Sequence, residues 1–124
     1  ANPPSPGIHV GGGVNLAQPD MTGSMVTISG YLNKKPPGMG RWVRRWFALK
    51  AGLLSYHTSE NVECIDSFVL YGSEVGRADD ELPTHPHCFY ITPPSKKGRK
   101  YILQAETEEH MTTWINCLKT CSQA

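Results

Sequence analysis

The segment GRWVRRWFALK, residues 40–50, decides the fold. From Trp42 onward it is rich in aromatic and β-branched residues, which are typical of strands. Turn-forming residues lie on both sides, with the sequence PPGMG before the segment and Ala51-Gly52 after it. The runs beyond these turns are again rich in strand formers, and the three predicted strands are residues 26–34, 42–50 and 53–58. Together they predict an antiparallel meander.

The rest of the chain continues the β pattern and then changes period. Four weaker strand candidates follow, at residues 67–71, around Val75, at 88–92 and at 100–105. After Thr107, a predicted N-cap, apolar residues recur at helical spacing: Met111, Trp114, Ile115 and Leu118. Trp114 is predicted to be the most deeply buried residue of this helix. The fold class is therefore mostly β, a strongly bent antiparallel sheet of seven strands closed by one C-terminal helix.

Composition limits what the chain does. The 124 residues suit one domain, and no run of apolar residues is long enough to cross a bilayer. Residues 1–24 contain four prolines, five glycines and one charged residue, so they are predicted to be a flexible tail or a linker partly of cloning origin, with the folded domain at 25–122. A net charge of +1 argues against nucleic-acid binding.

The residues that usually carry catalysis or metal binding are scattered. The cysteines are too dilute for a disulfide scaffold and are predicted to be reduced thiols of a cytoplasmic protein: Cys64, Cys88, Cys117 and Cys121. The loop His85-Pro86-His87-Cys88 has ligand types but not four ligands in suitable geometry, so no metal site is predicted. No nucleophile elbow or phosphate-binding loop is found. We therefore expect neither an enzyme nor a cofactor.

Several motifs in order resemble the pleckstrin homology (PH) domain family. They are GYLNKK at 30–35, the segment at 40–50, LLSY at 53–56, and a tryptophan, Trp114, in a helix that follows the strand YILQA at 101–105. The resemblance covers about residues 28–122. It implies a seven-stranded bent barrel or sandwich capped by one helix, and usually no catalysis.

Charge is unevenly distributed along the domain. Residues 25–58 hold six bases and no acid, whereas residues 59–91 hold seven acids and one base. A second basic cluster follows at Lys96, Lys97, Arg99 and Lys100. The resemblance implies that this cluster and the loop at 34–41 share the open end of the barrel. Both are predicted to contact an anionic membrane, with Met39 at the loop tip dipping into the headgroups.

Period-two alternation points to a more specific site. Arg45 shares a strand face with Phe47 and Leu49, so it is predicted to point inward at the barrel's mouth, where an anion would pair with it. The inositol-phosphate-binding members of the family carry a basic residue in the first strand, a basic-x-Arg pair in the second and a tyrosine in the third. Lys34, Arg45 and Tyr56 match this pattern, whereas Val43 departs from it. The predicted phosphoinositide site comprises Lys34, Lys35, Arg41, Arg45 and Tyr56.

Two interpretations of function follow. The first is a non-catalytic phosphoinositide- and anionic-lipid-binding module that recruits a parent signalling protein to the cytoplasmic face of a membrane, as a peripheral protein. The alternative is a PH-fold protein-interaction module that binds a peptide or a small GTPase through a sheet edge or the acidic stretch at 74–81. Val43, Glu60 and Glu63 favour that alternative, because all three count against a strong phosphate site. A separate, structural interpretation of Arg45 is that it pairs with a carboxylate such as Asp66 or Glu63 and holds the mouth together.

Overall fold

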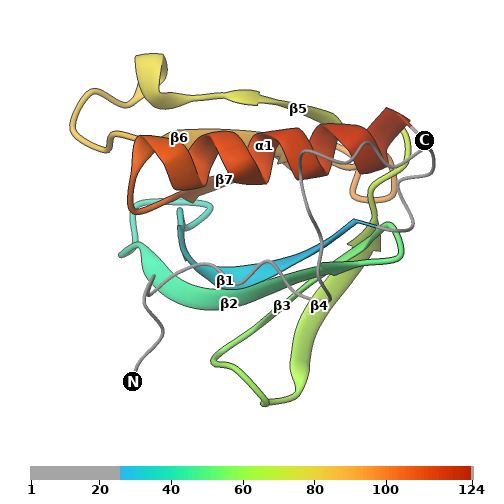
Figure 1. The fold of residues 1–124 in the computed structure, drawn as a ribbon. Coiled ribbons are helices and arrows are strands. Elements are labelled where there is room, and N and C mark those ends of the chain that lie inside the picture. The colour runs from blue at the N-terminus through green and yellow to red at the C-terminus, as the bar shows by residue number, and fades with distance from the viewer. Residues whose placement is uncertain (1–25, 124) are drawn as a thin grey trace.

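The computed structural model describes residues 26–123, so the predicted tail at 1–24 lies outside the described residues (Figure 1). Seven strands precede one helix: β1 (Thr27–Lys34), β2 (Val43–Lys50), β3 (Leu53–His57), β4 (Cys64–Val69), β5 (Glu74–Arg77), β6 (Cys88–Thr92), β7 (Tyr101–Gln104) and α1 (Glu108–Gln123). A short 3₁₀ turn, Asp79–Glu81, lies between β5 and β6. Within the described part, α1 is too short and too polar to cross a membrane.

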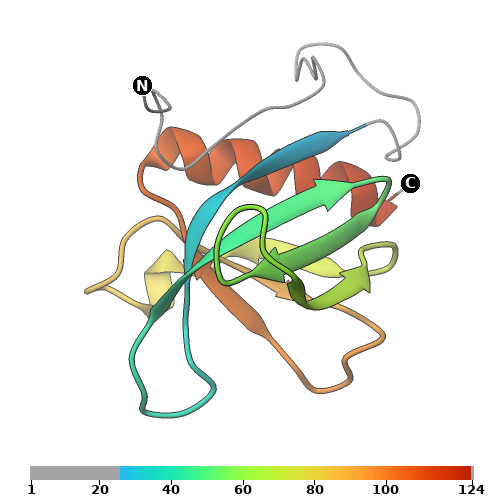
Figure 2. The same cartoon turned by 90° about the horizontal axis from the view of Figure 1, so that it is seen from below.

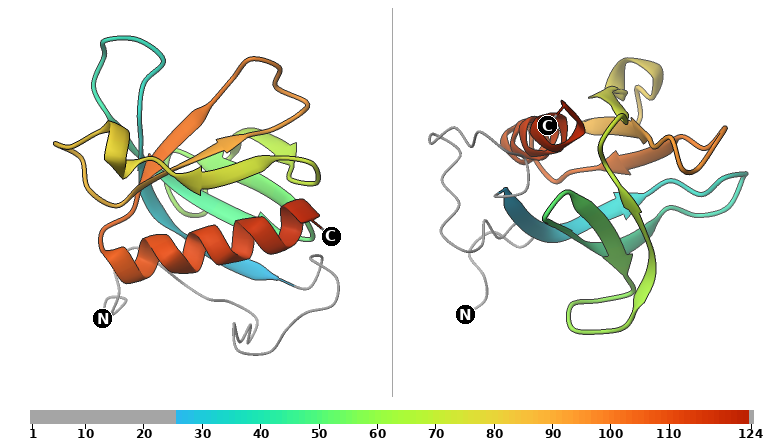
Figure 3. Two further views of the ribbon diagram at one scale, coloured as in Figure 1. Left: turned by 90° about the horizontal axis from the view of Figure 1, so that it is seen from above. Right: turned by 90° about the vertical axis from the view of Figure 1, so that its right-hand side faces the viewer.

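The strands form one antiparallel sheet in the order β4-β3-β2-β1-β7-β6-β5, which confirms the predicted fold class. The strand at 88–92 begins and ends where it is predicted to. The fourth strand, predicted at 67–71, begins at Cys64 and ends at Val69: Asp66 continues the regular register opposite Tyr56, and an irregularity between Tyr56 and His57 then pairs Cys64 with His57. The sheet folds on itself, and α1 closes the end opposite the β1–β2 and β6–β7 loops (Figure 3).

The core lies between the two halves of the bent sheet and α1. Trp114 is fully buried, as its place in the apolar stripe predicts, beside Phe47, Phe89 and Leu103, which are at most 1% exposed. Thr107 caps the helix, because the amide of His110 donates to its Oγ1 at 3.0 Å. The packed core and the capped helix hold the strands in place, and the loops between the strands project from them.

The β2–β3 turn is the tightest connection of the sheet. Ala51 (φ 54°) and Gly52 (φ 76°) both lie in the left-handed region, the combination that a two-residue type I′ hairpin requires. Glycine adopts this conformation freely, whereas alanine is strained in it. The turn predicted from Ala51-Gly52 is therefore present, with one suboptimal residue.

Two loops project together from the end of the barrel that α1 leaves open. The β1–β2 loop (35–42) and the β6–β7 loop (93–100) extend in the same direction, away from the helix (Figures 2 and 3). The amide of Lys35 donates to the carbonyl of Ile102 at 3.0 Å, which ties the bases of the two loops together. The shared open end inferred from the family resemblance is thus found.

Candidate functional site

The open end between these loops holds converging cationic side chains, and we call it the mouth. Its members come from β1, β2, β3, β4, β7 and the β6–β7 loop: Lys34, Arg45, Tyr56, Asp66, Lys96, Arg99 and Tyr101. The five that lie on strands face inward because strand alternation places them on the same side as the core residues two positions away.

Lys34 is the central cation of the mouth. Its Nζ lies 5.5 Å from the centroid of the Tyr56 ring and 5.8 Å from that of Tyr101, so the ammonium faces two aromatic rings. Partial burial lowers the pKa of Lys34, and the nearby charges of Arg99 and Arg45 lower it further. The mouth therefore concentrates positive charge, and its environment disfavours the charged form of Lys34.

Arg45 points inward on β2, as alternation predicts, and is half-buried. Its guanidinium donates to the carbonyl of Arg44 at 3.0 Å. Among residues 26–123 no carboxylate lies within ion-pair distance of it, and Asp66 pairs with Lys96 instead. The alternative in which Arg45 pairs with Asp66 or Glu63 is therefore wrong for the described chain, and its charge remains available to a ligand.

Tyr101 and Arg99 complete the inner surface. The Arg99 guanidinium carbon lies 4.5 Å from the centroid of the Tyr101 ring. Tyr101 is 2% exposed, and its buried hydroxyl has no hydrogen-bond partner among residues 26–123. Burial also raises the pKa of the neighbouring Tyr56. Tyr101 is a site residue that sequence reasoning missed, although its alternation with Leu103 carried the signal.

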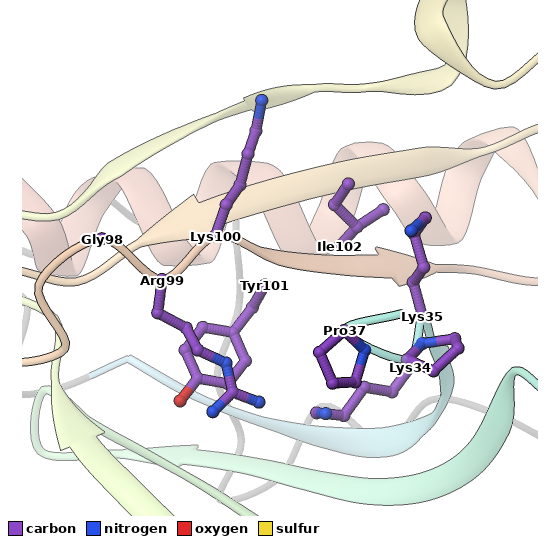
Figure 4. Close-up of a pocket in the computed structure, with 9 residues that line it drawn as sticks. Lys34, Lys35, Pro37, Gly98, Arg99, Lys100, Tyr101 and Ile102 are labelled. Atoms are coloured by element: carbon purple, nitrogen blue, oxygen red, sulfur yellow. The ribbon is translucent and has the colours of Figure 1, made fainter. Parts of the chain in front are cut away.

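A surface pocket opens beside the mouth between the two loops (Figure 4). It is lined by Lys34, Lys35, Pro36, Pro37, Gly98, Arg99, Lys100, Tyr101 and Ile102. In Figure 4 the charged ends of Lys34 and Arg99 approach one another below β7, whereas Lys100 extends in the opposite direction. The backbone of β7 thus separates an inner group of cations from an outer one.

The remaining predicted residues lie around this center rather than in it. The ammonium of Lys100 lies 3.9 Å from a Glu81 carboxylate oxygen and 4.5 Å from the centroid of the Tyr90 ring, so it is directed toward the β5–β6 side. Arg41 and Lys97 are exposed, and Met39 is 100% exposed at the loop tip. We call these solvent-exposed side chains around the mouth the rim: Met39, Arg41, Lys97 and Lys100.

Trp42 anchors the base of the β1–β2 loop. Its ring stacks on His85 of the β5–β6 segment, with centroids 4.3 Å apart and an interplanar angle of 8°. This stack ties the loop that carries Lys35, Arg41 and Met39 to the opposite half of the sheet.

Asp66 is the carboxylate in the mouth. Its two oxygens lie 3.0 and 3.2 Å from Lys96 Nζ. This hydrogen bond, with help from the Ser67 amide and from the charges of Lys96 and Arg99, lowers the pKa of Asp66 despite its partial burial. Glu60 and Glu63, which sequence reasoning set at the same rim, are exposed on the β3–β4 turn, where the Glu60 amide donates to the Tyr31 hydroxyl.

The thiols and histidines within residues 26–123 form no metal site that competes with the mouth. The four cysteines are unbonded to one another, and burial raises the pKa of Cys117 to about 12 and that of Cys88 to about 11. No group of three His, Cys, Asp or Glu side chains within the described range is arranged to hold a metal ion.

Comparison with known proteins agrees with this fold. Residues 26–123 match the family model of the PH domain. Mouse (Mus musculus) pleckstrin homology domain-containing family A member 4 is 32% identical over 100 residues, which make up 80% of this chain and 17% of that protein. The chain thus spans less than a fifth of the length of this relative.

Two solved structures share the fold. The PH domain of human oxysterol binding protein-related protein 11 is 25% identical with a TM-score of 0.67, over 89% of this chain and 86% of that one. The C-terminal PH domain of pleckstrin, solved in complex with D-myo-Ins(1,2,3,4,5)P5, is also 25% identical, with a TM-score of 0.62 over 77% of this chain and 96% of that one.

Proposed function

The chain belongs to the PH domain family, a family of non-catalytic modules, and from this premise we propose that it binds phosphoinositides through the mouth and recruits a parent protein to an anionic membrane. One observation carries the proposal. Lys34, Arg45 and Arg99 converge on one opening, and within the described residues none of the three forms an ion pair with a carboxylate. Cations brought together without counter-ions favour an anionic ligand that bridges them.

The aromatic rings of the mouth support the same proposal. Tyr56 and Tyr101 form a wall against which Lys34 and Arg99 lie, so the cations are held in place before a ligand arrives. A prearranged set of donors loses less side-chain entropy on binding. The pleckstrin domain of similar fold was solved with an inositol pentakisphosphate, a ligand whose charge suits such a set.

The rim adds a second, less specific contribution. Arg41, Lys97 and the fully exposed Met39 lie on the two loops that project from the mouth, where they would meet the surface of a membrane whose headgroup occupies the mouth. Each basic residue close to an anionic membrane adds about 1 kcal/mol of attraction. The rim thus strengthens membrane binding without selecting a headgroup.

The test is sedimentation with liposomes at fixed physiological salt, with no phosphoinositide, each monophosphate, each bisphosphate or the trisphosphate in an otherwise constant lipid mixture. Arg45→Ala should weaken binding about tenfold or more, because charge-assisted bonds to phosphate are worth ~1.5–3 kcal/mol. Arg44→Ala is the matched control, because it removes the same charge from the same strand. The Arg44 side chain lies on the outer face, with its guanidinium carbon 4.2 Å from the centroid of the Tyr31 ring.

The outcomes separate three possibilities. Selective binding that Arg45→Ala abolishes and Arg44→Ala spares supports a headgroup site in the mouth. Equal losses in both variants would reduce the site to nonspecific attraction by basic charge. No binding to any liposome would overturn the proposal and leave the protein-interaction alternative, for which the exposed β4 residues Ile65 and Val69 offer a sheet edge.

A further inference from the structure

Asp66 occupies an unusual place for a carboxylate in a basic mouth. It lies on β4 opposite Tyr56 and two residues before the buried Phe68, which sets its side chain on the inner face. The amide of Ser67 donates to its Oδ1 at 2.8 Å and fixes its orientation. The carboxylate is therefore held in place where it faces the cations.

Lys96 reaches Asp66 across an opening that the sheet itself does not close. β4 lies at one end of the strand order, whereas the β6–β7 loop belongs to the other half of the bent sheet. Between these two segments, as far as the described residues go, no backbone hydrogen bond is formed, and the contact is the ion pair of Lys96 Nζ with both carboxylate oxygens at 3.0 and 3.2 Å. Each side chain is about a third exposed, so a ligand can reach the pair.

The pair divides the cations of the mouth into two groups. Lys96 has an internal counter-ion, whereas Lys34, Arg45 and Arg99 have none within ion-pair distance in the described residues. A phosphate that enters among these three cations approaches the Asp66 carboxylate as well, and like charges at short range repel. If the carboxylate remains on Lys96, the fourth cation is unavailable to the ligand.

We propose that Asp66 limits the affinity of the mouth by competing with ligand phosphates for Lys96. This inference rests on the proposed function, because it concerns the same site. On binding, Lys96 leaves the carboxylate and pairs with a phosphate, while Asp66 keeps the Ser67 amide and exchanges Lys96 for water. A ligand must therefore carry enough charge to satisfy the three unpaired cations and also replace Asp66 on Lys96. The favoured class is an inositol ring with several phosphates, and a ring with a single phosphate is disfavoured.

The test measures binding of Asp66→Asn by calorimetry with soluble D-myo-Ins(1,2,3,4,5)P5 and by sedimentation with phosphatidylcholine vesicles that contain a phosphatidylinositol bisphosphate. Asparagine keeps the oxygen that accepts from the Ser67 amide and removes only the charge. We expect about tenfold tighter binding, the effect of removing one repulsive charge and freeing one cation at a partly exposed site. Asp80→Asn is the matched control, since Asp80 is exposed on the 3₁₀ turn and forms no ion pair in the described structure.

A double-mutant cycle distinguishes competition from simple repulsion. Because Asp66 holds Lys96 in the wild type, Lys96→Gln should weaken binding only about twofold there, but about tenfold when Asp66→Asn has freed the lysine. Equal effects of Lys96→Gln in the two backgrounds would show that the charges act independently and would overturn the inference. A thermal melt of each variant confirms folding, and Asp66→Ser, which also retains an oxygen near Ser67, repeats the test if the asparagine variant does not fold.

The results also separate this inference from the proposed function. Wild-type binding that Asp66→Asn leaves unchanged overturns the role of Asp66 alone, whereas absence of binding by both proteins to both probes overturns the proposed function and this inference with it. A gain with the soluble pentakisphosphate but not with vesicles supports the competition and identifies the ligand as a free inositol phosphate rather than a lipid headgroup.

Discussion

Val43 offers the most direct test of how the mouth works. It lies on β2 directly opposite Lys34 and two residues before Arg45, half-buried on the inner face. The family pattern has a basic residue here, and this chain has none. Val43→Arg would therefore place another guanidinium directly opposite Lys34 and two residues from Arg45, at the position where the phosphate-binding pattern is incomplete.

The expected gain follows from simple electrostatics. Two unit charges 4 Å apart interact by about 1 kcal/mol in water and about 4 kcal/mol at the effective dielectric of a protein surface. The mouth is open, so we take ~2 kcal/mol and subtract roughly 0.5–1 kcal/mol for ordering the new side chain. The remaining ~1.4 kcal/mol corresponds to about tenfold tighter binding of an inositol polyphosphate.

The same substitution should lower the stability of the unliganded protein. Burial and, to a smaller extent, the charges of Arg99 and Arg45 already lower the pKa of Lys34, so the new charge adds to an existing repulsion. We expect the free energy of unfolding to fall by about 1 kcal/mol, which lowers Tm by several degrees in a domain of this size. Saturating ligand should restore more Tm in Val43→Arg than in the wild type.

Calorimetry with D-myo-Ins(1,2,3,4,5)P5 at fixed salt measures the gain, and Val43→Gln serves as the control, because glutamine has a comparable stem without the charge. If Val43→Arg binds no more tightly than Val43→Gln, the ligand does not lie against the inner face of β2. The assignment of the mouth as the phosphate site would then be wrong.

Two predictions concern stability. Ala51→Asn should raise the free energy of unfolding by about 0.5–1 kcal/mol, because Asn-Gly suits the left-handed φ of 54° at Ala51, and no rise in a urea titration would contradict the type I′ assignment. Lys96 lowers the carboxyl pKa of Asp66, and Arg77 lowers those of Asp79 and Glu108. These carboxylates therefore stabilise the fold fully above their unfolded pKa of about 4. That contribution is lost as pH falls through the lower folded pKa values. Urea titrations from pH 7 to pH 3 should show this loss, and Arg77→Gln, which removes the shared partner of Asp79 and Glu108, should make it smaller; an unchanged acid dependence would mean that these pairs contribute nothing.

Local patterns were sufficient for the strands and the helix. The segment at 40–50 sits in the middle of the sheet order, and its alternation alone indicated that Arg45 and Phe47 share the inner face. The sequence predicts the fourth strand at 67–71, but β4 begins at Cys64. Asp66 pairs with Tyr56 in regular register, and Cys64 pairs with His57 only through the irregularity between Tyr56 and His57, which no sequence pattern shows. Alternation succeeds where pairing is regular and fails where the register shifts.

The basic cluster at 96–100 shows what sequence could not resolve. The sequence predicts that these residues share one membrane-facing surface, but β7 divides them. Arg99 lies over Tyr101 within the mouth, whereas Lys100 is directed toward Glu81. Alternation could have separated Arg99 from Lys100, because Arg99 lies two residues before the buried Tyr101, on the same face as Tyr101 and Leu103. The partnership of Lys96 with Asp66 had no such signal, because it joins residues 30 apart through the closure of the barrel.

The arrangement on β2 supports the proposal that the mouth serves ligand binding rather than stability. Phe47 and Leu49, at most 1% exposed, supply apolar burial at one end of the strand, while Arg45 at the other end has no carboxylate partner within the described chain. A mouth designed only for stability would pair each cation, as Asp66 pairs Lys96. Burial first and the charges of Arg99 and Arg45 second lower the pKa of Lys34, and a polyanionic ligand would relieve the repulsion among these cations. Ligand affinity and the instability of the empty mouth should therefore rise together across charge variants, and a series in which they vary independently would show that the cations do not act on a common ligand.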